Sequence, residues 1–202
     1  MTGWPMFEVR FNLADFERQA KVLHGALDQV PFALSLALND AIKQAREELV
    51  SETWPQHVTQ RNATFIKRAL RINFSTKRNL RAEVYDDLGR AHLKLHAKGG
   101  VKQGKHRLAI PPKGAVRRGA HGVVKSQRPA QIIANTPKRA LRVTPRGILV
   151  GKGGKLYLKY SFRPSANQPA DVPFDRDFEA FMLRQVRASF PAALVRAMKS
   201  RR

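Results

Sequence analysis

The stretch KGGVKQGKHRLAIPPKGAVRRGAHGVVKSQR (Lys98–Arg128) belongs to a longer run, Leu88–Ala170, that contains no aspartate or glutamate. This run carries 19 of the 38 lysines and arginines in the 202-residue chain. The flanking parts are close to balanced, because Met1–Asp87 has 12 basic and 11 acidic residues and Asp171–Arg202 has 7 and 4. The excess of positive charge is therefore regional, and we interpret the rest of the chain as a scaffold around it.

Folding the acid-free run onto itself gains nothing from internal ion pairs, and like-charge repulsion opposes its compaction. We therefore expect a negatively charged partner, which is either phosphate or the acidic surface of another protein. A solvated basic loop without a partner is the third interpretation. The residues expected to contact a partner or DNA are cations in the first half of the run: Lys98, Lys102, Lys105, Arg107, Lys113, Arg117, Arg118 and Lys125.

Length and composition predict a single domain over residues 1–202, in which 43% hydrophobic residues suffice for a core. The absence of cysteine excludes disulfides and thiolate metal sites, and it fits a reducing compartment. The longest apolar run, Val30–Leu38, is far shorter than the roughly 20 residues of a membrane span, and no export signal is recognisable at the amino terminus. We expect a protein that is neither exported nor bound to a membrane.

The first part of the chain, about residues 12–72, is predicted to be helical. It follows a short strand at Met6–Phe11, where apolar and polar residues alternate. Asn12 is a helix cap, and apolar residues spaced by three and four continue from there to Val30. Pro31 begins a second helix, which is predicted to stop at Trp54 because the following proline disfavours the helical conformation. A third, basic helix is expected at 59–72.

The middle of the chain, about residues 80–162, is predicted to form a β-sheet with a long basic loop. Alternation at 81–85 and 90–97 around a turn predicts one β-hairpin. Because Lys98–Arg128 is rich in glycine, only Arg107–Ile110 is expected to pair as a strand, and the remainder is expected to be a loop that becomes ordered on a partner. Gly147–Val150 and Leu156–Phe162 predict a second hairpin around Gly151–Gly154.

The last part is predicted to be an extended connector, Arg163–Pro173, followed by a terminal helix at about 174–200. The apolar residues of this helix lie on one side, and Pro191 is expected to kink or divide it. The predicted fold class is α+β. Amino-terminal helices and a carboxy-terminal helix are expected to pack on a small antiparallel β-sheet that carries the long basic loop.

Patterns typical of catalysis or of metal and cofactor binding are weak in this sequence. His92 and His96 are four residues apart, but on the predicted strand they would lie about 13 Å apart, too far to share a metal ion. No helix start follows Gly151–Gly154, so we interpret this run as a hairpin turn and not as a phosphate cradle. The 15 acidic residues suggest no carboxylate pair in a cleft. We therefore predict no catalytic residue, cofactor or metal, and no enzyme activity.

Aromatic residues are missing from the centre of the acid-free run, because Leu88–Leu156 contains no Phe, Tyr or Trp. Proteins that bind single strands stack bases on such side chains, so sequence reading is not expected. The remaining modes are phosphate contact, which weakens steeply with salt, and docking on an acidic protein. The glycine-rich reach of the predicted loop favours docking, because such a segment can wrap around a partner.

The order of elements resembles that of a phage family. The features that carry the resemblance are two amino-terminal apolar-striped helices, a basic middle with Gly99-Gly100 and Leu108–Pro111, and Val172–Phe174 leading into a terminal helix. The chain is similar in these features to the minor tail protein Z family of tailed phages and prophages, and more loosely to phage neck and tail-completion proteins. The basic middle is longer than in the shortest members of that family.

The resemblance implies a structural role without catalytic residues. Copies would form a homo-oligomeric ring, for which the family favours a hexamer, at the head-proximal end of the tail. The expected neighbours are the tail terminator, the tail tube and the head connector, with non-specific DNA contact as a further expectation. The protein would be made in the host cytoplasm and end in the virion tail or neck. The alternative functions are a sequence-independent nucleic-acid-binding protein and, less favoured, a basic nuclease or toxin.

Overall fold

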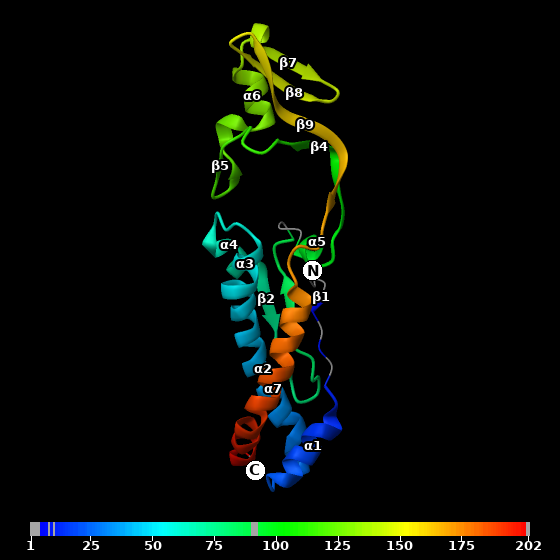
Figure 1. The fold of residues 1–202 in the computed structure, drawn as a ribbon. Helices are drawn as coiled ribbons and strands as arrows, with labels where there is room; N and C mark the ends of the chain where they lie inside the picture. Colours follow the sequence, from blue (N-terminus) through cyan, green and yellow to red (C-terminus); the bar gives the residue numbers. More distant parts are fainter. Residues whose placement is uncertain (1–4, 8, 10, 90–92, 201–202) are drawn as a thin grey trace. The chain divides into compact units, whose positions relative to one another are not determined.

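A computed structural model describes residues 5–7, 9, 11–89 and 93–200 (Figure 1). The chain is arranged in two compact units, which are considered one at a time below. Unit 1 consists of residues 1–59, 63–97 and 171–202, and unit 2 consists of residues 60–62 and 98–170. Along the sequence, unit 2 is almost entirely one insertion into unit 1.

Unit 1 contains most of the helices. Its elements are β1 (Pro5–Phe7), α1 (Leu13–Val22), the 3₁₀ turn η1 (Leu27–Gln29), α2 (Val30–Glu48), the π-helical turn η2 (Leu49–Thr53), α3 (Trp54–His57), α4 (Ala63–Ala69), β2 (Leu70–Asn73), β3 (Glu83–Asp86), α5 (Leu93–Lys98, whose last residue falls in unit 2) and α7 (Phe174–Lys199). The predicted first strand, Met6–Phe11, is β1 only as far as Phe7, and residues 8 and 10 lie outside the described residues.

Helix α1 begins where the sequence predicts and ends earlier. The side chain of Asn12 accepts a hydrogen bond from the Ala14 N–H at 3.0 Å. After Val22 the chain leaves the helix, with His24 in the left-handed conformation at φ 54°. The N–H groups of His24 and Gly25 bond the carbonyls of Lys21 and Ala20 at 3.1 and 2.8 Å, which is the Schellman arrangement of a helix end. The prediction of a single helix that continues to Val30 is therefore wrong.

Helices α2 and α7 pack against each other and form the core of unit 1 (Figure 1). The predicted apolar stripe of α7 is buried at Phe178, Met182, Val186, Phe190 and Leu194, whereas Phe181 and Met198 are only partly buried. Pro191 lies inside α7, which is not divided there. Fully buried alanines of α2, such as Ala37 and Ala41, allow the two helices to approach closely.

Helix α2 does not end the helical segment at Trp54 as predicted. A π-helical turn at Leu49–Thr53 and the short helix α3 continue it to His57. The N–H of Trp54 bonds the carbonyl of Leu49, five residues back, and this wider turn precedes Pro55. The Trp54 ring stacks on Phe174 at a centroid distance of 5.9 Å, so tertiary packing outweighs the local preference against a helical residue before proline.

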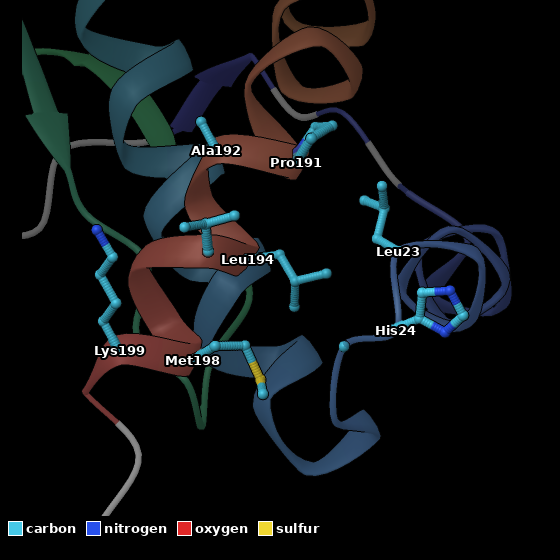
Figure 2. A pocket seen from close by; sticks show the side chains of 9 residues that line it. Leu23, His24, Pro191, Ala192, Leu194, Met198 and Lys199 are labelled. Atoms are coloured by element: carbon cyan, nitrogen blue, oxygen red, sulfur yellow. The ribbon is translucent and has the colours of Figure 1, made fainter.

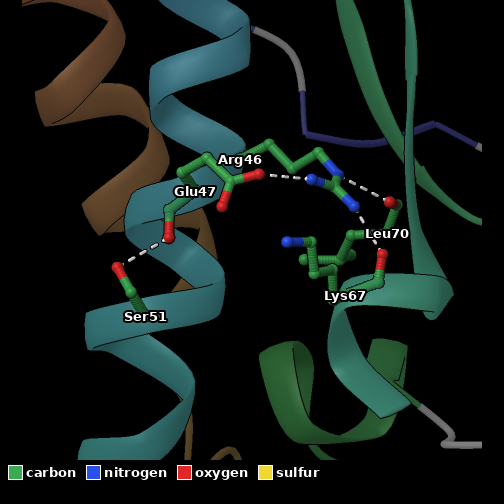
Figure 3. Close-up of polar contacts among 5 residues, drawn as sticks. All are labelled: Arg46, Glu47, Ser51, Lys67 and Leu70. Atoms are coloured by element: carbon green, nitrogen blue, oxygen red, sulfur yellow. Dashed lines mark hydrogen bonds and ion pairs between the residues drawn. The ribbon is translucent and has the colours of Figure 1, made fainter. Parts of the chain in front are cut away.

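Arg46 of α2 holds the carboxyl end of α4 (Figure 3). Its guanidinium donates hydrogen bonds to the carbonyls of Lys67 and of Leu70, the latter at 2.8 Å, and pairs with Glu47 at 2.6 Å. A cation at this end satisfies carbonyls that have no partner within the helix. The predicted third helix, 59–72, is thus shorter than expected, since α4 spans Ala63–Ala69 and β2 follows directly.

The sheet of unit 1 has the antiparallel strand order β1-β3-β2. The predicted hairpin between 81–85 and 90–97 is wrong, because β3 pairs with β1 and β2, and Leu93–Lys98 forms α5. Leu93 and Ala97 are four residues apart, so a helix directs both to the core, where Leu93 is fully buried. Residues 90–92 lie outside the described part of the chain.

Unit 2 is built on an antiparallel sheet of strand order β4-β9-β8-β7. Its elements are β4 (Gly100–Ile110), β5 (Arg118–Gly119), β6 (Gly122–Val123), η3 (Lys125–Gln127), α6 (Pro129–Asn135), η4 (Lys138–Ala140), β7 (Leu141–Thr144), β8 (Gly147–Lys152) and β9 (Lys155–Gln168). The second predicted hairpin is confirmed as β8–β9, and its two turn residues, Gly153 and Gly154, have φ values of 57° and 75°.

The long basic loop predicted at Lys98–Arg128 is not found. Strand β4 pairs with β9 along Gly100–Gln103 and again along Leu108–Ile110, with an irregularity between the two paired parts. Strand β9 continues to Gln168, so most of the predicted connector 163–173 is also strand. The α+β class is confirmed, with amino-terminal helices, a carboxy-terminal helix and antiparallel sheets.

A small core holds unit 2 together. Ile132 of α6, Ile148 of β8 and Tyr160 of β9 are buried, and Val116 and Phe162 pack against them. The Tyr160 hydroxyl donates a hydrogen bond to the Gln127 carbonyl at 2.9 Å and so joins the sheet to η3. Burial raises the pKa of Tyr160, while the charge of Arg118 acts in the opposite direction.

Candidate polyanion-binding unit

Unit 2 is a folded body whose main segment contains no acidic side chain. Residues 98–170 include 17 lysines and arginines and no aspartate or glutamate. None of these cations can form an ion pair within that segment. Ion pairs in the described part of the chain, such as Arg71 with Asp87 at 3.6 Å and Arg176 with Asp177 at 2.9 Å, lie within unit 1.

The predicted contact residues lie on three parts of unit 2. Lys98 is the last residue of α5, and Lys102, Lys105 and Arg107 are on β4. Lys113 follows β4 in a turn and is exposed. The others, Arg117, Arg118 and Lys125, are exposed around the β5–β6 hairpin.

The β5–β6 hairpin brings three of the predicted cations together. Arg118 is in register with Val123, and the Val124 N–H bonds the Arg117 carbonyl at 3.1 Å. The backbone N–H of Arg117 also donates to the Gln127 side chain, which follows Lys125 by two residues. Hydrogen bonds thus hold the backbone of this basic hairpin, and its charged groups remain in solvent.

Three other cations of unit 2 bond backbone carbonyls of the same unit. The Arg107 guanidinium donates to the Pro145 carbonyl, Lys159 Nζ to Ala115 O at 3.0 Å, and Arg128 Nε to Val123 O at 3.4 Å. Arg107 therefore has a structural role in addition to its charge. It is therefore less suited to bind a partner freely than the exposed cations of the β5–β6 hairpin.

The sequence prediction missed the cations of the second half of unit 2. These residues are exposed and lie on η4, on β7 or at the β7–β8 and β8–β9 turns: Lys138, Arg139, Arg142, Arg146, Lys152 and Lys155. Lys152 and Lys155 face each other directly across the β8–β9 turn. Like charges directly opposite each other destabilise a hairpin, so this arrangement gains from a negatively charged partner.

Unit 2 offers few surfaces on which bases could stack. Tyr160 is buried in the core and Phe162 packs against it. Tyr157 is about half exposed, at 49%, on β9. Exposed cations without an aromatic platform are typical of contact with phosphates or with an acidic protein surface.

The other site types considered in the sequence gain no support. His96 lies on α5 and not on a strand, with its Nδ1 atom 2.7 Å from Oδ1 of Asp171, and His92 is outside the described residues. Among residues 5–7, 9, 11–89 and 93–200, no group of three His, Asp or Glu side chains could hold a metal ion. Within the same residues, every helix is too short or too polar to cross a membrane.

Comparison with known proteins gives no relative from which a function could be transferred. No protein-family model, curated protein or solved structure matches the chain.

Proposed function

We propose that the protein is a structural subunit of a tailed phage or prophage, forming a tail-completion or neck ring at the head–tail junction. Unit 1 would supply the scaffold, and unit 2 would contact a negatively charged partner in the virion. The neighbours would be the tail terminator, tail tube and head connector. The proposal includes no catalytic step.

The observation that carries the proposal is the acid-free charge of a folded unit. Seventeen cations without one carboxylate in residues 98–170 oppose folding by mutual repulsion, and this cost is offset when a polyanion or an acidic surface binds. The resemblance of the sequence to minor tail protein Z supports the phage role. The amphipathic helices of unit 1 and the insertion of unit 2 are also compatible with a subunit of a larger assembly.

Two partners suit unit 2, and the fold alters the preference between them. Docking by wrapping around a protein was expected from a glycine-rich loop, but the first part of that segment, Gly100–Ile110, is strand β4 and pairs with β9. A folded basic surface can instead line a channel through which DNA passes, with phosphate contacts and no base reading. It can equally set the orientation of an acidic neighbouring ring.

The ring is tested by measuring the mass of the purified protein in solution, alone and with tail tube protein, by light scattering after size-exclusion chromatography. We expect a ring of defined copy number at least in the presence of the tail tube. A monomer in both samples, together with normal head–tail joining by a phage that lacks this protein, contradicts the proposal.

The second candidate is a sequence-independent nucleic-acid-binding protein, which the many exposed cations of unit 2 favour. The test variant carries Lys113, Arg117, Arg118 and Lys125 replaced by Gln. Each lost phosphate contact lowers the salt dependence of binding by about 0.9, so the slope of log K against log salt should fall by up to roughly 4.

The matched control has the same change in net charge on unit 1, with Arg68, Lys77, Arg78 and Arg187 replaced by Gln. All four are exposed. An equal loss of slope in the control shows a general charge effect and excludes a DNA surface on unit 2. Normal DNA binding with failed head–tail joining in the test variant assigns unit 2 to an acidic protein neighbour.

A further inference from the structure

Two surfaces of the protein combine exposed apolar side chains with nearby cations. The first is a groove of about 590 Å³ in unit 1, between the end of α1 and α7 (Figure 2). Its nine lining residues include His24 and Lys199 and no carboxylate, and none of them indicates the chemistry of a partner. The second is the end of the β8–β9 hairpin in unit 2, where the side chains do indicate a partner.

The end of the β8–β9 hairpin is open to solvent. A Cβ atom on either turn residue, Gly153 or Gly154, would meet nothing within 4 Å. Lys152 and Lys155 lie directly opposite each other beside this turn, and both are exposed. The next residues, 156–158, are two leucines with a tyrosine between them, and they are 58%, 49% and 41% exposed. Positive charge and apolar surface are thus available to a partner at the same place.

Tyr157 lies on the same face of the hairpin as the two lysines. Paired residues of antiparallel strands share a face, and so do residues two apart on one strand. Lys152 pairs with Lys155, and two residues further from the turn Val150 pairs with Tyr157. Two residues along a strand correspond to about 7 Å. The hairpin therefore presents one aromatic ring and two ammonium groups close together on one face.

Two more cations lie beside this end of the hairpin. A Cβ atom on Gly151 would lie 3.6 Å from the carbonyl oxygen of Ala140. Lys138 and Arg139 immediately precede Ala140, and both are exposed. Since residues 98–170 contain no aspartate or glutamate, this segment supplies no carboxylate to neutralise the cluster. The charge of the cluster is thus available to a negatively charged partner.

The order of side chains from the turn argues against insertion into a membrane. Lys152 and Lys155 are nearest to the turn, and the exposed residues 156–158 follow behind them. Entry of the turn into a bilayer would bury both ammonium groups before the apolar side chains, and charged groups inside a bilayer are costly. The partner should therefore present negative charge and apolar surface side by side.

A single strand of nucleic acid has this combination of groups. Its phosphates are negative, and the faces of its unpaired bases are free to stack on aromatic side chains. In a duplex the bases are paired and stacked on each other, so Tyr157 would reach no base face. An acidic protein surface would satisfy the lysines and leave the exposed ring without a specific contact.

We propose that the end of the β8–β9 hairpin binds an unpaired strand of nucleic acid, with Lys152 and Lys155 at the phosphates and a base stacked on Tyr157. Such stacking reads no sequence, because every base has a π face. Tyr157 directly follows the stretch 88–156, which contains no aromatic residue. The inference rests on nucleic-acid contact by unit 2, the second candidate under the proposed function, and adds the kind of strand and the residues that hold it.

Fluorescence anisotropy with a labelled oligothymidylate, and with duplex DNA of the same length, tests the site. Tyr157→Ala should weaken binding of the oligothymidylate about 5- to 150-fold, the effect of losing one stacked base, and should leave duplex binding unchanged. Tyr157→Phe keeps the ring and should retain wild-type affinity. Replacing Lys152 and Lys155 by Gln should lower the slope of log K against log salt by roughly 1.4, because each phosphate contact on a single strand contributes about 0.7.

The matched control is Phe74→Ala in unit 1. Phe74 is 53% exposed, and Lys43 Nζ lies 5.5 Å from its ring centroid, so this position also combines an exposed ring with a cation. The control should bind the oligothymidylate as the wild type does. Unchanged affinity of Tyr157→Ala, an equal loss in Phe74→Ala, or an equal loss in Tyr157→Phe overturns the proposed site.

Photochemical cross-linking tests the stacking on the unsubstituted protein. An oligothymidylate that carries 5-iodouracil is irradiated with the protein, and the tryptic peptides are identified by mass spectrometry. Trypsin cuts after Lys155 and Lys159, so a cross-link to Tyr157 appears on the peptide 156–159, which excludes the buried Tyr160. We expect the cross-link on this peptide. Cross-links on other aromatic peptides, without one on 156–159, contradict the stacking.

Two further probes identify other kinds of partner. Binding of polyglutamate without binding of the oligothymidylate assigns the hairpin to an acidic protein surface. Binding of phosphatidylglycerol vesicles without binding of the oligothymidylate assigns it to a membrane. Either result overturns the proposed strand contact.

The failure of this site is distinguishable from the failure of the proposed function. Normal binding by Tyr157→Ala, with a loss of affinity when Lys113, Arg117, Arg118 and Lys125 are replaced, shows that unit 2 binds nucleic acid through other residues. A wild-type protein that binds neither the oligothymidylate nor the duplex excludes both the hairpin site and the nucleic-acid candidate. The ring is judged separately, by the mass of the protein in solution.

Discussion

The His96 side chain and the Asp171 side chain meet at 2.7 Å, and the His96 carbonyl accepts the N–H groups of Asp171 and Val172 at 3.1 Å each. His96 comes two residues before Lys98, and Asp171 comes directly after Ala170. The two chain segments that lead into and out of unit 2 are thus joined within unit 1. This contact is expected to contribute to the stability of unit 1.

Asp171→Ala should lower the free energy of unfolding by about 0.5–1.5 kcal/mol, because a partly buried hydrogen bond is lost. Urea unfolding followed by circular dichroism measures the change. Glu179→Ala, an exposed carboxylate on α7, is the control and should change stability by less. Equal effects of the two substitutions would show that the contact with His96 adds nothing.

Gly147 is expected to be indispensable to the sheet of unit 2. A Cβ atom at this position would lie 2.1 Å from the backbone carbonyl oxygen of Tyr160. The backbone at Tyr160 cannot move away from it without breaking the β8–β9 pairing. Gly147→Ala should cost at least about 1–3 kcal/mol, the usual range for overpacking. Hydrogen exchange of the β8 and β9 amides measures the loss.

Gly151 provides the control for Gly147 on the same strand. Its added Cβ would meet nothing closer than 3.6 Å, which is ordinary contact. Gly151→Ala should therefore retain the protection of β8 and β9. If Gly147→Ala also keeps full protection, the nearby Tyr160 carbonyl does not exclude a side chain at position 147.

Phe178 and Phe181 of α7 should differ in their contribution to stability. Phe178 is buried in the core of unit 1, and Phe178→Ala should cost about 3–5 kcal/mol. Phe181 is partly buried beneath the Arg184 guanidinium, which lies 5.4 Å from the ring centroid, so Phe181→Ala should cost clearly less. Thermal unfolding compares the two variants, and the reverse order would contradict the assigned core.

Asn39 should stabilise the loop that follows β2. Its side chain accepts the Ser75 N–H at 2.8 Å and donates to the Ser75 carbonyl at 3.0 Å, and Ser75 is buried. Asn39→Ala leaves the buried Ser75 N–H without this acceptor and should cost about 1–3 kcal/mol. Gln44→Ala, at an exposed position of α2, should be close to neutral in the same urea titration.

Periodicity over long segments predicted the parts of the fold in which local pattern and packing agree. The stripe of α7 and the Gly153-Gly154 turn of β8–β9 belong to this class. The strand predicted at Arg107–Ile110 is confirmed as the end of β4. The earlier part of β4 was missed because Gly104 and the irregular pairing around it interrupt the alternation, and because the paired residues of β9 lie over 50 residues away in sequence. Helix α5 was missed because Leu93 and Leu95 alternate with polar residues as in a strand, and the helix of six residues is too short to show a helical period.

The sequence predicted the candidate contact residues in the first half of unit 2 and missed the exposed cations in its second half. The absence of carboxylates extends to Ala170 in the sequence, but the predicted contact residues stop at Lys125 because they follow the glycine-rich segment. The cations from Lys138 to Lys155 lie on or beside the consecutive strands β7, β8 and β9, and the pairing of β9 with β4 joins them to the segment of the predicted contact residues. Long-range pairing of this kind is not encoded in local spacing.

The adjacent boundaries of unit 2 make it exchangeable. A Cβ atom on Gly99 would lie 3.0 Å from the Ala170 nitrogen, so the two ends of the insertion are neighbours. Recombination could therefore remove this segment, or graft a different one at the same place, while the remaining helices keep their connections. A related protein could in this way have a different partner and retain the same scaffold.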